Sequence, residues 1–224
     1  MGTRSFSVFI KTDQTHKFSL EKISTELFNP ENLKIPYDLL GGEMSIWIGR
    51  YKNGILIINY YLTWEIIAYQ NENWIKRIYD FFVNPELIVA YVLNDHNMSA
   101  GYSVIKEGEI IRYRYNAPFK DTNRTGNFGI PYKVEMEHLN KLEISKEEGF
   151  DTKRQMNKMT IYHTGKTTYY YYVDFFMVNA IITELLEYSA YENSIPNHID
   201  ATEIKFNSDK IENGRSEKRL LIIN

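Results

Sequence analysis

Cysteine is absent from the 224-residue sequence. Without thiols the chain can form no disulfide, no thiolate metal site and no iron–sulfur cluster, and it has no cysteine nucleophile. Long apolar runs are also missing, since no stretch reaches the roughly 18 uninterrupted apolar residues of a membrane span. The first residues lack the apolar core of a secretory signal. We therefore expect a cytoplasmic protein that does not associate with a membrane.

A strong net charge of either sign is missing as well. The chain has 29 acidic and 26 basic residues, which gives a formal net charge of −3. Nucleic-acid-binding domains usually carry a strongly basic surface, so this balance argues against a nucleic-acid partner. Apolar residues make up 43% of the sequence and charged residues 25%, as in a globular domain that can bury a core.

Sequence motifs of common enzymes and cofactor sites are absent too. The chain contains no Gly-x-Ser-x-Gly, His-Glu-x-x-His or Gly-x-Gly-x-x-Gly pattern. Gly165-Lys166-Thr167 has the ending of a phosphate-binding loop, but Thr160 occupies the position of its first glycine. A tyrosine run follows, which is typical of a strand, whereas phosphate binding needs the start of a helix. We therefore predict a hairpin turn here and no cofactor.

The five histidines do not suggest a metal site. Glu135 and His138 have the helical Glu-x-x-His spacing of di-metal bundles, but the chain has no second copy of that motif. His198 and Asp200 would share one face of an extended segment, in a connection that contains proline. We expect solvated histidines and no metal.

Three segments have the pattern of a β-hairpin, in which two apolar strands flank a short polar turn. The clearest contains Asn53-Gly54, a pair that tolerates positive φ at both residues. In another, a two-residue turn at Glu107-Gly108 would place Lys106 opposite Glu109. The predicted strand pairs are Met44–Tyr51 with Ile55–Leu62, Ala100–Lys106 with Glu109–Tyr115, and Met159–His163 with Thr167–Val173.

Amphipathic spacing predicts three helices, capped by Ser19, Asn73 and Asp174. Hairpins dominate and no strand–helix unit repeats. We therefore predict an α+β fold, with a mostly antiparallel sheet built from β-hairpins and about three helices packed on it. We expect residues 1–224 to form one domain, in which residues 116–157 are an irregular, partly packed connection.

Asp95 and His96 are the candidates for a catalytic pair. They lie in the loop between two predicted strands, where the aspartate could orient the imidazole as a general base. The alternative is turn chemistry, because Asn94, Asp95 and Asn97 are residues that tight connections favour.

The order of features around this loop is a buried strand, a polar loop with His96, then Gly101-Tyr102-Ser103-Val104, Glu107-Gly108 and Arg112. In this order the segment Asn94–Pro118 resembles a family of uncharacterised single-domain bacterial proteins of unknown function. That family has no assigned activity, so the resemblance implies no catalytic or binding residues.

Arg112 and Arg114 are the candidates for binding an anionic ligand or an acidic partner surface. A regular hairpin would place both arginines on one face, opposite Ser103 and Gly101, with Ile111 and Tyr113 on the other face. Small residues there would leave both guanidinium groups open to a carboxylate or phosphate. The alternative is that both arginines are solvated or paired within the chain.

The tyrosines at positions 169–172 supply a second candidate binding surface. Alternation along a strand sends Tyr170 and Tyr172 to one face and Tyr169 and Tyr171 to the other. One of these pairs would lie in the core, and the other would form an exposed aromatic patch of the kind that marks a protein interface.

The function that these features favour is a non-enzymatic protein-interaction module, comparable to bacterial immunity or accessory proteins. We expect its partner to be another protein, with homo-oligomer formation left open, and an exposed patch of Tyr and Trp side chains. The alternative is a hydrolase or transferase that acts on an anionic small molecule, with a site around Asp95, His96 and Arg112.

Overall fold

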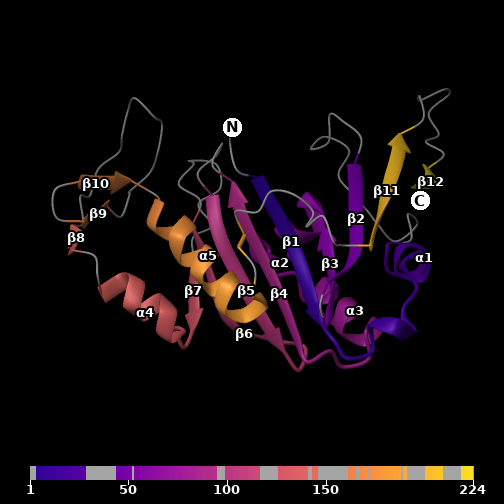
Figure 1. Cartoon of the computed structure of the whole chain (residues 1–224), viewed down its shortest axis with the longest axis horizontal. Helices are drawn as coiled ribbons and strands as arrows, with labels where there is room; N and C mark the ends of the chain where they lie inside the picture. The colour runs from indigo at the N-terminus through magenta and orange to yellow at the C-terminus, as the bar shows by residue number, and fades with distance from the viewer. Residues whose placement is uncertain are drawn as a thin grey trace.

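The computed structural model describes residues 4–28, 44–51, 53–94, 99–116, 126–140, 143–145, 161–164, 167–170, 172–187, 189–190, 200–208 and 218–223. Its main feature is a nine-stranded sheet with the order β12-β11-β2-β3-β1-β4-β5-β6-β7 (Figure 1). All neighbouring strands in it are antiparallel. The strands are β1 (Arg4–Lys11), β2 (Met44–Tyr51), β3 (Gly54–Ile58), β4 (Leu87–Asn94), β5 (Ser99–Lys106), β6 (Glu109–Asn116), β7 (Gly126–Gly129), β11 (Asp200–Ser208) and β12 (Lys218–Ile223).

A smaller three-stranded sheet has the order β10-β9-β8. The helices are α1 (Leu20–Lys22), which continues as a π-helical turn, α2 (Tyr60–Ile67), α3 (Glu72–Phe81), α4 (Lys133–Asn140) and α5 (Tyr172–Leu186). The smaller strands are β8 (Glu143–Ser145), β9 (Ile161–Thr164) and β10 (Thr167–Tyr170). The predicted α+β class and all three predicted hairpins are confirmed, and α2 and α4 are helices beyond the three expected. None of the helices in the described residues is long and apolar enough to cross a membrane.

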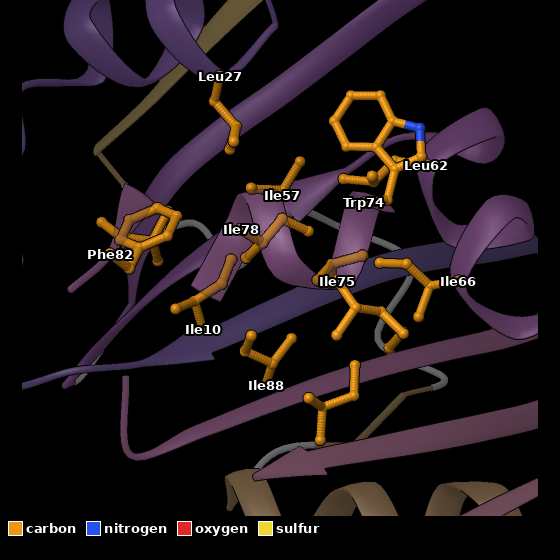
Figure 2. Close-up of a cluster of buried hydrophobic side chains, with 14 of the residues drawn as sticks. Ile10, Leu27, Ile57, Leu62, Ile66, Trp74, Ile75, Ile78, Phe82 and Ile88 are labelled. Atoms are coloured by element: carbon orange, nitrogen blue, oxygen red, sulfur yellow. The ribbon is translucent and has the colours of Figure 1, made fainter. Parts of the chain in front are cut away.

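One face of the sheet is covered by α2, α3 and the helical segment around α1. Alternate residues of the central strands, such as Ile10, Ile57 and Ile88, point into this layer, where they meet Ile66 and Ile78 (Figure 2). These side chains are almost fully buried. The layer is the larger of two apolar clusters and fixes α2 against the sheet.

The opposite face is covered by α5, which crosses the sheet in front of β4 and β5 (Figure 1). The intervening residues of the same strands, such as Val89 and Leu93, pack here against Val178 and Ile182. Because the central strands are buried on both faces, β3 and β4 are nearly continuous apolar runs.

Asparagines begin both helices of the larger layer. The Asn59 side chain accepts a hydrogen bond from the Leu62 N–H at 2.8 Å, so the chain leaves the sheet after Ile58 and starts α2. The predicted strand through Leu62 was therefore too long. Asn71 caps α3, and the prediction that Asn73 would do so was wrong, because Asn73 is already helical and donates its N–H to the Asn71 side chain.

The stretch from 116 to 157 contains more regular structure than the sequence predicted. It includes β7, α4 and β8. β7 pairs with β6, and α4 packs beside α5. These two elements therefore place residues 126–140 next to the β5–β6 hairpin, where the candidate site residues lie.

Candidate functional site

The β5–β6 hairpin turns at Glu107-Gly108, and both residues have positive φ, 54° and 80°. Lys106 lies opposite Glu109, as the sequence predicted. Farther from the turn, however, a β-bulge shifts the register between Val104 and Ile105. The cause is one extra residue in β6, which reverses the faces of all the side chains that follow it.

The bulge turns Arg112 toward the α5 face of the sheet. Arg112 lies opposite Val104, where the sequence predicted that it would lie opposite Ser103. The prediction was wrong because it assumed a regular hairpin. Ile111 is the extra residue between the pairs Ile105–Ile110 and Val104–Arg112, and it is 42% exposed.

Arg112 is held by a dense network of hydrogen bonds. Its Nη2 donates to Glu135 Oε1 at 2.5 Å and its Nε to Glu135 Oε2 at 2.8 Å, a bidentate ion pair. Nη1 donates to Asn127 Oδ1 and to the Phe128 carbonyl, both at 2.6 Å. The Tyr102 hydroxyl accepts from Nε at 3.0 Å, and the guanidinium lies 5.8 Å from the centre of the Tyr102 ring. We call these five residues the Arg112 cluster.

Both charges of the Arg112 cluster are removed from solvent. The side chains of Arg112 and Glu135 are 2% and 0% exposed. Burial acts to raise the pKa of Glu135, but hydrogen bonds from Arg112, from the Tyr102 hydroxyl and from the Tyr132 N–H outweigh it and hold this pKa below its ordinary value. Burial acts to lower the pKa of Arg112, and the bonds to Glu135 and Tyr102 reverse that effect. The pair is therefore ionised at neutral pH.

The network joins four elements through one guanidinium. Tyr102 lies on β5, Arg112 on β6, Asn127 and Phe128 on β7, and Glu135 on α4. A guanidinium has five N–H donors in a rigid fork, which suits such a junction. The fork is bidentate to an internal carboxylate, so Arg112 is paired within the chain, which is the alternative to an open binding site.

Arg114 and Ser103, which were also predicted to bind a ligand, are not members of the Arg112 cluster. Arg114 is half-buried and lies opposite Tyr102, not opposite Gly101 as predicted. Ser103 is fully buried and lies opposite Tyr113, on the other face of the sheet from the arginines. Its Oγ has no hydrogen-bond partner in the part of the chain that the structure describes. The structure thus does not bring Ser103 together with the arginines.

Asp95 and His96 lie outside the described residues, and so does His198. Tyr170 ends β10 and Tyr172 belongs to α5, so the predicted strand alternation does not extend to residue 172. The side chains of both tyrosines are also outside the description. Within the described ranges, no group of three His, Asp or Glu side chains could hold a metal ion.

An aromatic strip runs from β1 over α2 to β6. Phe6 meets Tyr60 edge-to-face at 4.6 Å between ring centres, and Tyr60 stacks on Trp64 at 5.6 Å with 13° between the ring planes. Trp64 then meets Tyr115 edge-to-face at 5.7 Å. Tyr60 is 42% exposed, whereas Tyr115 is buried. The strip therefore connects the surface to the core beneath α2. We call these four residues the aromatic strip.

Apolar side chains are also exposed around β7. Phe128 lies opposite Tyr113, which belongs to the core beneath α2, and Ile130 follows two residues later. Phe128 and Ile130 are 60% and 87% exposed. The backbone of Ile111 lies against Gly129, because a Cβ added to Gly129 would lie 2.1 Å from the Ile111 carbonyl oxygen, and the Ile111 side chain is 42% exposed. We call Ile111, Phe128 and Ile130 the β7 patch.

Among the side chains of the predicted Tyr and Trp surface that the structure describes, Tyr60 and Tyr69 are exposed. Trp47 and Trp64 are half-buried and Trp74 is buried. The β7 patch was missed, although its signal is present in the sequence: two large apolar residues, Phe128 and Ile130, alternate within a glycine-rich segment. Comparison with protein-family models, with curated proteins and with solved structures finds no match.

Proposed function

We propose that the protein is a non-enzymatic interaction module that binds another protein through the β7 patch and the aromatic strip. The observation that carries this proposal is the exposure of Ile111, Phe128 and Ile130, which lie on β6 and around β7 at the end of the main sheet. Single exposed apolar residues are ordinary, but a contiguous group of them is typical of an interaction site.

The aromatic strip supports the same function. Aromatic side chains are enriched in protein interfaces because they bury a large area with few rotatable bonds. Tyr60 offers its ring and hydroxyl at the surface, while Trp64 and Tyr115 anchor the strip to the core. A partner with an apolar surface could therefore bury Tyr60 at little cost in side-chain ordering. The lack of cysteine and the small net charge support a cytoplasmic location and a partner that is not a nucleic acid.

The proposal is tested by introducing charge into the β7 patch. The double variant Phe128→Asp/Ile130→Asp should fold, because both side chains are mostly exposed to solvent. Immobilised wild type and variant are compared for the proteins they retain from an extract of the cells that encode the chain. The variant should retain at least about tenfold less of a partner protein than the wild type does, as expected when a binding hot spot is removed.

The matched control is Val83→Asp, which places the same charge on an exposed apolar residue after α3 (61% exposed). This variant should retain the partner at the wild-type level. Equal retention by all three proteins would show that the β7 patch is not the binding surface.

A further inference from the structure

β7 has little apolar burial of its own to hold it in place. Two of its four residues are glycines, and Asn127 and Phe128 are exposed. In the part of the chain that the structure describes, it pairs with β6 alone. Ile130, just beyond the strand, is 87% exposed. Burial therefore contributes little to fixing the backbone that carries Phe128 and Ile130.

Arg112 supplies the contacts that burial does not. Its Nη1 lies 2.6 Å from both Asn127 Oδ1 and the Phe128 carbonyl oxygen. The Gly129 carbonyl oxygen follows at 3.5 Å, and the Tyr113 carbonyl oxygen of β6 lies 3.1 Å from the same nitrogen. Hydrogen bonds from an ionised donor are roughly twice as strong as those between neutral groups. One guanidinium nitrogen therefore joins the backbone of β7 to β6.

Glu135 holds the other end of the same segment. Its Oε2 accepts a hydrogen bond from the Tyr132 N–H at 2.8 Å. The Tyr132 carbonyl accepts from the Met136 N–H at 3.1 Å, which makes Tyr132 the N-cap of α4 and Glu135 the third helical residue, bonded back to the cap. The Phe128 carbonyl and the Tyr132 N–H are thus bound by the two members of one buried ion pair.

The residues between these two contacts have few conformations available. Pro131 has a fixed φ, and Ile130, which precedes it, is confined largely to extended conformations. Gly129 lies so close to the Ile111 carbonyl that it has no space for a Cβ. With both ends held, residues 128–132 have little conformational entropy left to lose when a partner binds.

We propose that the Arg112–Glu135 pair is a clamp that presets residues 128–132 for partner binding. Both side chains are almost fully buried, so they act through the backbone and do not touch the partner. They are positioning residues, because a partner that buries Phe128 and Ile130 meets a smaller ordering cost in the segment that carries them. The inference rests on the proposed function, since it assigns how the backbone of the β7 patch is held.

Hydrogen exchange of the full chain tests the clamp without a partner. In Arg112→Ala, the backbone N–H groups of residues 126–132 should exchange at least about tenfold faster than in the wild type, while those of β1 and β4 change little, because the segment opens locally. Ethylguanidinium replaces the atoms that the substitution removes, and at millimolar concentration it should slow this exchange again. Ethylammonium has the same charge without the fork and should not.

Arg77→Ala is the matched control, because Arg77 on α3 also donates to a backbone carbonyl, that of Glu26 at 2.9 Å. It should leave exchange in residues 126–132 unchanged. Unchanged exchange there in Arg112→Ala, equal acceleration in β1 and β4, or equal effects of the two additives would overturn the clamp. If Arg112→Ala does not fold, Arg112→Lys is measured, since one ammonium group lacks the fork that binds Phe128 and Glu135 together. Unchanged exchange in Arg112→Lys would overturn the clamp as well.

Retention from the cell extract separates the clamp from the proposed function. Where the wild type retains a protein that Phe128→Asp/Ile130→Asp loses, Arg112→Ala should retain at least about threefold less of it, and ethylguanidinium should restore retention. Equal retention by Arg112→Ala and the wild type would overturn the clamp and leave the proposed function intact. If no such protein is retained, the proposed function fails, and the role of the clamp in binding fails with it even where exchange in residues 126–132 follows the prediction.

Discussion

Arg112 is a cation in the interior of the protein, and its surroundings explain how it is tolerated there. Glu135 neutralises the charge, while Tyr102, Asn127 and the Phe128 carbonyl accept further hydrogen bonds. Removing one member of a buried ion pair leaves the other charge uncompensated, which is more costly than the pair itself is stabilising. The cluster therefore joins β5, β6, β7 and α4 around one buried ion pair.

The ionisation of Glu135 gives a prediction about pH. Its pKa is lowered from the ordinary value of 4.5, so its contribution to stability is present above 4.5 and is lost as the pH falls through the folded-state pKa. The free energy of unfolding of Glu135→Gln should lie below that of the wild type by up to about 3–5 kcal/mol near neutral pH. Urea denaturation of both proteins over a series of pH values should show that this difference in unfolding free energy shrinks below pH 4.5.

Glu137→Gln is the control for this measurement. Glu137 is exposed on α4 and pairs with Lys133 at 3.7 Å, and exposed pairs on helices contribute about 0.2–0.5 kcal/mol. The substitution Glu137→Gln should therefore change the free energy of unfolding only slightly at every pH. A difference between wild type and Glu135→Gln that stays constant well below pH 4.5 would contradict the assignment of a lowered pKa to Glu135.

β7 depends on a glycine that touches the β-bulge. Gly129 has a φ of +82°, and a Cβ there would lie 2.1 Å from the Ile111 carbonyl oxygen. Gly108 in the β5–β6 turn has a similar φ of +80°, but its nearest neighbour is a Tyr79 ring atom at 3.4 Å. Gly108→Ala should therefore cost only the strain of the left-handed conformation, about 1–2 kcal/mol.

Gly129→Ala should be clearly more destabilising than Gly108→Ala, because a backbone clash is added to the same strain. The two variants are compared by denaturant unfolding, and hydrogen exchange then locates the damage. Faster exchange in β7 and the outer part of β6 is expected for Gly129→Ala alone. Equal unfolding free energies for the two variants would show that the close contact between β7 and the bulge does not stabilise the fold.

The elements that the sequence predicts well are those with local signals. The turn at Glu107-Gly108, the helix capped by Ser19 and the apolar strand β4 depend on neighbouring residues, and all are confirmed. The bulge in β6 was not predictable in this way. Arg112, which follows the bulge, binds Glu135 23 residues away in the sequence, and a contact of that range leaves no periodic pattern.

Other errors had local causes. The start of α2 was missed because Ile55 to Leu62 is almost uninterruptedly apolar, although Asn59 is a good helix cap. β7 and α4 are too short to show a clear period, and they are held by contacts with β6 and α5. The unpredicted β-bulge in β6 changed the predicted site more than it changed the predicted fold. One unpredicted residue in β6 turned Arg112 from an expected surface ligand into a buried junction.

The sheet as a whole explains why the exposed apolar groups lie where they do. Helices cover the central strands on both faces, so residues there are buried whichever way they point (Figure 1). At β7 the cover is incomplete, and Phe128 continues the apolar surface of Tyr113 outward into solvent. The proposed function therefore belongs to the end of the sheet at β7, where α2 and α3 do not cover the strand.

Site-directed photo-crosslinking tests the proposed binding surface most directly. Phe128→Cys carries a benzophenone maleimide in one chain and Val83→Cys carries it in another, and each is specific because the sequence has no other thiol. After illumination in an extract of the native cells, position 128 should give an adduct of one discrete mass, and position 83 should give none of that mass. No adduct from position 128, or the same adducts from both positions, would contradict the assignment of the β7 patch as the binding surface.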